Sequence, residues 1–485
     1  MLASHGSPVP TQIEWKQQEL GVAFNTNSLT GNLTWDFGDG GSGMGHQINH
    51  VYASPGHYHV IASDQSNQHA TADIDVISRA PSFRISAVGS PDAGEPSLGI
   101  VGDCWFFQAR LDVMRSCDRG LTWTRVNGQL NAPTTRDPFL TTDRATGRVF
   151  SAQLGANGEC IWIAWTDDSG GSWSANPLDC GPIPFADHPK MATGPRVGPM
   201  AGVPDAAYPD TVYLCFNRYV IPTSGPNLGI ACFASLDGGA TFTVGGQVTT
   251  IGGLHGPLAV GPDGAVYVPA RTDPVQVFRS TDGAVSWTAS TVGADVGVQD
   301  PTQDPGVSVD QAGHALAAWI GKDNRLYVAR ASSDLVWTPS QPVLPVEIGS
   351  AVFPTIQTWA PGRVALAYLG TTDLRGNPQD APANATWDLY MSWSTDALAD
   401  HPHFFTQKLT TDPVQVGPIC IQEPCADGSR NLLDFIDMEL DAAGHPVVAF
   451  ADGCVDVCAT TPNESASRSA MGTVAALEAG PSLAG

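Results

Sequence analysis

Short apolar runs, most of them opened by a polar residue and a proline, recur along the chain from about residue 82. Most of these runs are followed by a second apolar stretch that begins at a glycine, such as Gly264-Ala-Val-Tyr-Val-Pro-Ala270. No long stretch shows the apolar spacing of an amphipathic helix, so the pattern predicts pairs of neighbouring β-strands. The openings are Glu95-Pro96, Asp137-Pro138, His188-Pro189, His255-Gly-Pro257, Asp304-Pro305 and Phe353-Pro354.

An eight-residue pattern lies between these strand pairs and reads Ser/Thr, any residue, Asp, any residue, Gly, any residue, Ser/Thr, aromatic. Successive copies are 45 to 69 residues apart, which is the range for repeated four-stranded units. The Asp can accept backbone N–H groups within a turn, and the Gly supplies a positive φ, so each copy predicts a hairpin turn. Full copies begin at Ser116, Thr166 and Ser235, a copy with Ala284 in place of Gly begins at Ser280, and eroded copies begin at Ser332 and Ser394.

The pattern is the Asp-box, and the chain therefore resembles the sialidase-like (BNR-repeat) β-propellers. The resemblance implies an all-β propeller, which we place at residues 82–478. Sialidases usually have six blades, but the stretches beginning at Leu432 and Gly444 repeat the strand pair once more, so six or seven blades are expected. In the family the motif lies on outer turns away from the active-site mouth. Its carboxylates are therefore expected to be structural: Asp118, Asp168, Asp237 and Asp282.

Residues 10–79 form a separate module. They contain Leu33-Thr-Trp-Asp-Phe-Gly-Asp-Gly40 and, after a loop, His50-Val-Tyr-Ala-Ser-Pro-Gly-His-Tyr-His-Val60. These two stretches resemble the PKD domain, a small immunoglobulin-like β-sandwich in which Trp35 would fill the core. In that family such modules act as extracellular spacers or contact proteins and carbohydrates, and a spacer is the expectation here.

The formal net charge is −25, and only four lysines occur among the 485 residues. Such a surface repels phosphate backbones, so nucleic acid is not an expected partner. The acidic balance makes calcium a candidate ligand, although the sequence defines no set of metal ligands and no certain cofactor. No stretch reaches the roughly 20 apolar residues of a membrane-spanning helix. The residues after Met1 lack a signal peptide, and we expect a mature or trimmed form of a secreted or cell-surface protein.

Ten cysteines are distributed along the chain without the clustering of a metal site. Their even number favours disulfides and an oxidising compartment. Sequons at Asn32, Asn384 and Asn463 are compatible with a glycoprotein. The expected pairs are Cys104 with Cys117, Cys160 with Cys180, Cys215 with Cys232, Cys420 with Cys425, and Cys454 with Cys458, crossed pairing among the last four being the alternative.

The residues that open the inner strands should meet at one mouth of the central channel, where ligand sites of propellers concentrate. Converging carboxylates and imidazoles could hold a divalent ion or shift each other's pKa for acid/base work. The alternative is that they cap strand ends or orient turns before proline. The expected ring consists of Glu95, Asp137, His188 with Asp187, His255, Asp304 with Asp300, and Asp434.

Sialidases clamp the sialate carboxylate with three arginines, use a Tyr–Glu nucleophile pair, and use an Asp as acid/base. The first arginine belongs to an Arg-Ile-Pro motif, and this chain has Gly94-Glu95-Pro96 at the corresponding place. A carboxylate there would repel sialate. Arg218 and Arg271 remain candidates for the other clamps, and Tyr368 is a candidate nucleophile without an evident glutamate partner.

We expect a non-catalytic platform that binds a glycan or an extracellular protein partner at the propeller, without sialidase activity. The alternative is a sialidase-like or other glycoside hydrolase with Asp137 and Asp304 as acid and base and with Arg218 and Arg271 as clamps. Three arginines converging on the mouth would favour the enzyme, and a bare acidic ring would favour binding. Self-assembly stays open.

Overall fold

A computed structural model gives the conformation of the chain and divides it into two compact units, with the boundary between Phe83 and Arg84 and with Leu477–Pro481 grouped with the first unit. The structure describes residues 13–18, 21–26, 28–77, 81–127, 136–155, 161–178, 185–203, 207–220, 226–299, 303–332, 334–402, 404–425, 429–462, 466–467, 469–480 and 482–484.

The N-terminal unit is a β-sandwich with two sheets among its described residues. Trp35 is buried in its core against Phe24, as expected, and its Nε1 donates to the carbonyl of Gly45 at 2.7 Å. One sheet has the order β1 (Glu14–Gln18), β2 (Gly21–Asn25), β5 (Gln47–Val51), and the other β4 (Ser42–Met44), β3 (Thr34–Asp36), β6 (Gly56–Ser63), β7 (His69–Val76).

The second unit is a β-propeller whose described residues form seven sheets, which we call blades 1 to 7. The strands of blades 1 to 6 are antiparallel hairpins in chain order, each starting at its inner strand. The inner strands contact one another in sequence (β9, β13, β17, β21, β25, β29, β34), and β34 returns to β9. This closed ring confirms the all-β propeller and fixes the blade count at seven.

Each blade runs from an inner strand at the central axis to an outer strand. Blade 1 consists of β9 (Ser97–Val101), β10 (Cys104–Ala109), β11 (Asp112–Ser116) and β12 (Thr124–Arg125). Blade 2 consists of β13 (Arg136–Thr142), β14 (Val149–Leu154), β15 (Ile161–Thr166) and β16 (Ser174–Leu178). Blade 3 consists of β17 (Phe185–Gly194), β18 (Thr211–Tyr219), β19 (Asn227–Ser235) and β20 (Val244–Thr249). Blade 4 is β21 (Ala259–Val260), β22 (Val266–Ala270), β23 (Val275–Ser280), β24 (Thr288–Val292); blade 5 is β25 (Gly306–Val309), β26 (Ala315–Ile320), β27 (Leu326–Ala331), β28 (Gln341–Pro342). Blade 6 is β29 (Ser350–Thr358), β30 (Val364–Thr371), β31 (Thr386–Ser394), β32 (Phe405–Lys408), with β33 (Gln415–Val416) also paired to β31. Short helical turns are η1 (Gly198–Met200), η2 (Pro378–Asp380) and α1 (Val457–Thr460).

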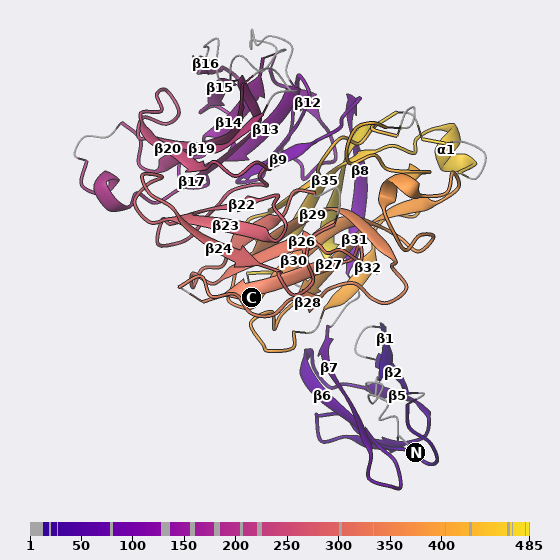
Figure 1. Cartoon of the computed structure of the whole chain (residues 1–485). Helices are drawn as coiled ribbons and strands as arrows, with labels where there is room; N and C mark the ends of the chain where they lie inside the picture. The colour runs from indigo at the N-terminus through magenta and orange to yellow at the C-terminus, as the bar shows by residue number, and fades with distance from the viewer. Residues whose placement is uncertain are drawn as a thin grey trace, which may run out of the picture. The chain divides into compact units, whose positions relative to one another are not determined.

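Blade 7 is built from both ends of the propeller sequence. Its order is β34 (Asp437–Leu440), β35 (Pro446–Asp452), β36 (Met471–Ala479) and then β8 (Ser82–Pro91) as the outer strand. In Figure 1 the violet β8 lies beside the yellow C-terminal strands. The first strand of the propeller therefore closes the last blade, and β36 is not left as an open sheet edge.

The repeated eight-residue motif forms the turn between the third and fourth strands of a blade. In blade 2, Asp168 Oδ1 accepts the backbone N–H of Ser172 at 2.8 Å, and Thr166 Oγ1 accepts that of Gly170 at 2.8 Å. Gly170 has a φ of +87°. Hydrogen bonds from Ser172 and Thr166 lower the pKa of Asp168 to about 2. Asp118, Asp237 and Asp282 make the same pattern of bonds.

These turns lie at the end of each blade opposite to the start of the inner strand, because strands one and three run in the same direction. The motif carboxylates are fully used by the turn, which accounts for them as structural groups.

Four disulfides join cysteines of the described residues, with the partners expected from the sequence. They pair Cys104 with Cys117, Cys215 with Cys232, Cys420 with Cys425, and Cys454 with Cys458. The fifth expected pair, Cys160 with Cys180, lies outside the described residues. Within the described part of the chain, no helix is long and apolar enough to cross a membrane.

Candidate functional site

A chain of hydrogen-bonded carboxyl groups lies where the inner strands of blades 1 to 3 begin. Asp137 shares hydrogen bonds with both Glu95 and Asp187. Burial and the nearby charge of Asp137 raise the pKa of Glu95 well above its usual value, and the same two causes raise the pKa of Asp187. Burial alone would raise the pKa of Asp137, but the hydrogen bonds with Asp187 and Glu95 and the nearby His188 lower it. The three carboxyls thus form a coupled group in which the pKa of Asp137 is lowered while those of its two neighbours are raised.

A local backbone irregularity produces this arrangement. Glu95, Asp137 and His188 each precede a proline and have φ values of +56°, +44° and +57°. The strand register is interrupted between Arg136 and Phe139 in blade 2 and between Asp187 and Lys190 in blade 3. A positive φ before proline is sterically costly for an L-residue, and in blades 2 and 3 it coincides with a bulge in the inner strand.

Two histidines and an ion pair continue the ring through blades 3 to 5. His188 Nε2 lies 2.6 Å from Asp304 Oδ2, and Arg271 Nη1 lies 3.5 Å from Asp304 Oδ1. The neighbouring positive charges lower the pKa of Asp304 despite its burial. His255 packs edge-on against His188, and burial lowers its pKa to about 3, so it is neutral. Its Nδ1 donates to the carbonyl of Gly256 at 3.0 Å, and its Nε2 has no hydrogen-bond partner among the described residues.

Blade 7 contributes two acidic groups. Asp434 forms a two-point ion pair with Arg430, with N–O distances of 2.8 Å, and its charge acts on Glu95. Asp437 Oδ2 accepts the backbone N–H of Leu98 at 2.8 Å, which joins blade 7 to blade 1. Burial, assisted by the charge of Glu439, raises the pKa of Asp437 to about 7.

Lys190 lies beneath this ring, two residues after His188. Its Nζ is 3.3 Å from the centre of the Phe435 ring and 4.8 Å from that of Phe139. Burial lowers its pKa, although carboxylates oppose that change. The carboxylates that act on it belong to Asp304, Glu95, Asp137 and Asp437.

Lys190 and Asp437 were not among the candidates expected from the sequence. Lys190 is one of only four lysines and lies on an inner strand immediately after a blade opening, which was a usable signal. Asp437 gave no comparable signal, because it begins a strand like many other polar residues.

The six expected ring residues are all brought to one end of the channel: Glu95, Asp137, His188, His255, Asp304 and Asp434. Asp300 lies outside the described residues. Next to Glu95 and Asp137 is a pocket of about 600 Å³, within the range of about 300–1,000 Å³ typical of small-molecule sites. Its other lining residues include Asp92, Arg110, Asp112, Arg125, Pro138 and Leu433.

Tyr368 does not lie at this site. Its side chain is fully buried in the hydrophobic core around blades 5 and 6, stacked on Tyr390, and its hydroxyl contacts Ser392 Oγ at 3.0 Å. Burial raises the pKa of its phenol, which opposes formation of a nucleophilic phenolate. We therefore assign no catalytic role to Tyr368.

The arginines do not form a sialate clamp. Arg271 is paired with Asp304 and Arg430 with Asp434, so both guanidinium groups are neutralised by carboxylates. Arg218 lies on β18 opposite Ala186. Among the described residues, no three His, Cys, Asp or Glu side chains form a group that could hold a metal ion. The site is thus an acidic, proton-sharing ring beside an open pocket.

Comparison with known protein families identifies the N-terminal unit. Residues 14–78 match the PKD domain family. No curated protein sequence matches the chain. Solved structures that are similar to it include the following three. A Dyadobacter fermentans protein of unknown function has 13% identity and a TM-score of 0.45, covering 82% of this chain and 100% of that one. The BP39L lectin from Burkholderia pseudomallei has 12% identity and a TM-score of 0.45, covering 75% and 94%. The leech intramolecular trans-sialidase has 11% identity and a TM-score of 0.41, covering 83% and 92%. At these identities the similarities do not identify an activity.

Proposed function

We propose that the chain is a secreted carbohydrate-binding protein whose ligand site is the pocket at the channel mouth. The observation that carries the proposal is a pocket of about 600 Å³ lined by the acidic residues Glu95 and Asp137 and by the ion pairs Arg110–Asp92 and Arg125–Asp112.

The rest of the pocket suits a sugar ring. Arg110 lies 3.6 Å from Asp92, and Arg125 lies 2.9 Å from Asp112, so the rim presents fixed donors and acceptors for hydroxyl groups. Leu433 supplies an apolar surface for the C–H face of a pyranose. A few polar groups on an apolar lining are typical of small-molecule sites.

Glycoside hydrolysis is the alternative, and the different pKa directions of Glu95 and Asp137 are its main support. The spacing opposes it. Retaining glycosidases separate their two carboxyl groups by about 5–5.5 Å and inverting ones by about 6.5–9.5 Å, whereas this pair shares a hydrogen bond. Sialidase activity is opposed further by the acidic ring, which repels a sialate carboxylate.

Secretion accords with the four disulfides, since such bonds persist in oxidising compartments. Asn32 and Asn384 are exposed and therefore accessible as glycosylation sequons. In this proposal the PKD unit serves as a spacer that presents the propeller.

The proposal is tested with a glycan array, followed by isothermal titration with the glycan that gives the strongest binding signal on the array. Arg110→Ala removes a rim group and should weaken binding about tenfold or more, whereas Arg330→Ala, which removes an ion pair with the exposed Asp400, should leave binding unchanged. Absence of any glycan ligand, or equal loss in both variants, would contradict the proposal. Turnover of the bound glycan that disappears in Asp137→Asn would establish the hydrolase instead.

A further inference from the structure

We propose that the site at the channel mouth continues into a second, adjoining pocket and binds a neutral linear oligosaccharide that occupies both pockets at once. This inference rests on the proposed function and specifies the ligand class of the same site. It follows from the position of the second pocket, from the loop that forms its wall and from the pairing of the charged groups around it.

The second pocket has a volume of about 420 Å³ and adjoins the pocket of about 600 Å³ at the channel mouth, which we call the mouth pocket. Both volumes lie in the range of about 300–1,000 Å³ typical of small-molecule sites, so each pocket has room for part of a ligand. Four residues line both pockets and form the boundary between them: Asp92, Gly94, Arg110 and Leu433.

The boundary offers polar and apolar surface together. Arg110 and Asp92 lie 3.6 Å apart, and both side chains are exposed, so a ligand in either pocket can reach them. Leu433 packs over Gly94, where a Cβ would lie 2.6 Å from Leu433 Cγ, so this close approach requires glycine. A pyranose uses such a combination, because its hydroxyl groups both donate and accept and its C–H face is apolar.

The loop between β33 and β34 forms one wall of the second pocket, and its own contacts hold it in shape. The Cys420–Cys425 disulfide closes part of this loop, and the Cys420 backbone N–H donates to the carbonyl of Ser429 at 2.9 Å. Arg430 pairs with Asp434 at 2.8 Å and donates to the carbonyl of Cys420 at 3.3 Å. A preformed wall lowers the conformational entropy lost on binding.

Further hydrogen bonds fasten this wall to blades 1 and 7. Asn431 Nδ2 donates to the carbonyl of Ser469 at 2.6 Å and to Gln415 Oε1 at 3.1 Å. The backbone N–H of Glu95 donates to the carbonyl of Leu432 at 3.3 Å. The wall of the second pocket is therefore joined directly to Glu95, which lines the mouth pocket.

Non-glycine residues with a positive φ are concentrated around both pockets. This backbone conformation is unfavourable for an L-residue, and in proteins it clusters at ligand sites because the surroundings must hold it there. Three of the residues line the shared boundary, so the strain extends to the second pocket. The φ values are +51° at Asp92, +56° at Glu95, +50° at Arg110, +44° at Asp137 and +60° at Leu433.

An extended peptide is the competing ligand for two adjoining pockets, and the lining opposes it. A peptide that binds as an added strand needs an exposed strand edge. All the residues that line the second pocket lie outside the strands, in turns and in the loop between β33 and β34. The pocket therefore offers side chains for hydroxyl groups and no strand for a peptide backbone.

The pairing of the arginines favours a neutral oligosaccharide over an anionic one. Three arginines line the two pockets, and each is paired with a carboxylate. A uronate or sulfate group would gain little attraction from guanidinium groups that are already neutralised. The pairs are Arg110–Asp92, Arg125–Asp112 and Arg430–Asp434.

Isothermal titration of the full chain with sugars of different length tests the inference. The neutral probes are glucose with cellotetraose, xylose with xylotetraose, and mannose with β-1,4-mannotetraose; tetragalacturonate and tetraglycine represent the anionic and peptide ligands. We expect at least one neutral tetrasaccharide to bind at least about tenfold more tightly than its monosaccharide, because the second pocket adds contacts without a second loss of translational freedom. Tetragalacturonate and tetraglycine should bind more weakly than that tetrasaccharide.

Ser469→Tyr places a large side chain in the second pocket, since Ser469 is exposed there and does not line the mouth pocket. The variant should reduce the gain from monosaccharide to tetrasaccharide to less than about threefold. Ser174→Tyr is the matched control, because Ser174 is exposed on β16 and lines neither pocket, and it should keep the full gain. If Ser469→Tyr fails to fold, Glu423→Ala should reduce the same gain, because Glu423 also lines the second pocket alone.

Equal affinities for monosaccharide and tetrasaccharide in every series would overturn the inference and leave the proposed function intact. The same holds if other glycans bind at the mouth and none of these tetrasaccharides binds. A full gain in both Ser469→Tyr and Glu423→Ala, or binding of tetragalacturonate or tetraglycine as tight as that of the best neutral tetrasaccharide, would also overturn it. Failure of every glycan would overturn both proposals.

Discussion

Backbone strain at single residues is concentrated at the channel mouth. Glu95, Asp137 and His188 have positive φ values directly before a proline, and Phe353 repeats the geometry in blade 6. Each such residue costs about 1–3 kcal/mol and persists only when its surroundings hold it. At three of the four positions the strained residue is a polar group of the ring, and in blades 2, 3 and 6 a bulge interrupts the inner strand at the same place.

Asp452, at the end of β35, should make stability depend on pH. Burial, assisted by Asp412, raises its pKa to about 7. Between about pH 4 and pH 7 the folded state then holds a proton that the unfolded chain releases, so stability falls as the pH rises across this range and levels off above about pH 7. Between pH 5 and pH 8 the Asp452→Asn variant should lose about 2 kcal/mol less unfolding free energy than the unmodified chain. Urea denaturation of both proteins at the two pH values measures this difference.

The same denaturation series on Asp263→Asn provides the control, because Asp263 is half-exposed and paired with Arg279. Its pH dependence should match that of the unmodified chain. A wild-type-like loss of stability in Asp452→Asn would show that its carboxyl group is already ionised below pH 7.

Only some copies of the turn motif need a glycine at the fifth position to avoid a steric clash with neighbouring side chains. Gly170 has a φ of +87°, and a Cβ there would lie 2.7 Å from Val126 Cβ, so Gly170→Ala should destabilise by about 2 kcal/mol. Ala284 already occupies this position at a φ of +69° with its methyl group buried. Ala284→Gly relieves strain and loses a buried methyl, so its effect should stay within about 1 kcal/mol. Thermal unfolding compares the two, and equal losses would contradict this account.

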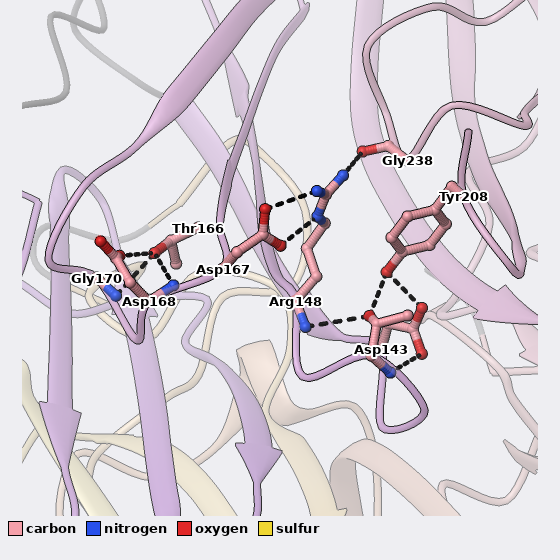
Figure 2. A network of polar contacts seen from close by, with 9 residues as sticks. Asp143, Arg148, Thr166, Asp167, Asp168, Gly170, Tyr208 and Gly238 are labelled. Atoms are coloured by element: carbon pink, nitrogen blue, oxygen red, sulfur yellow. Dashed lines mark hydrogen bonds and ion pairs between the residues drawn. The ribbon is translucent and has the colours of Figure 1, made fainter.

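At the scale of elements, arginines connect three of the motif turns to the preceding blade. The carbonyl that follows the motif Asp accepts a guanidinium hydrogen bond in three successive blades: Arg84 binds the carbonyl of Arg119, Arg115 that of Ser169 and Arg148 that of Gly238. Figure 2 shows the third of these contacts, where Arg148 bridges Gly238 and Asp167 and lies close to Tyr208. Adjacent blades are thus joined by polar contacts on the face opposite the mouth as well as by their apolar cores.

Arg148→Ala should destabilise the propeller by about 1–2 kcal/mol. The change removes the two-point ion pair with Asp167, at N–O distances of 2.7 Å, the bond to Gly238 and the packing over the Tyr208 ring. Arg330→Ala removes one bond to Asp400, which is 93% exposed, and should cost less than about 0.5 kcal/mol. Urea denaturation of both variants tests the comparison, and equal costs would show that the inter-blade contact is no stronger than a surface pair.

Local patterns predicted much of this fold. The turn motif and the proline openings are contiguous in sequence, so they revealed the blades and the residues that meet at the mouth. Pairings over long distances could not be predicted, because the partner of β8 lies almost 400 residues away and sheet register is set by packing. The positions of Lys190 and Tyr368 relative to the site could not be predicted from the sequence either. Their roles depend on how the blades pack. In the folded chain Lys190 lies beneath the ring, and Tyr368 lies in the hydrophobic core.

At the scale of the whole propeller, stability should depend on closure of blade 7 by β8. A chain beginning at Ser82 keeps this strand, and a chain beginning at Ala93 lacks it and exposes the N–H and C=O groups along the edge of β36. Because the seven inner strands form one closed ring, a weakened last blade also loosens its contacts with blades 1 and 6. We expect the melting temperature of the shorter chain to fall by at least about 10 °C relative to the chain beginning at Ser82, which should unfold in one cooperative step. Calorimetry of the two chains measures this, and equal melting temperatures would show that the first six blades and three strands of the seventh are sufficient for the fold.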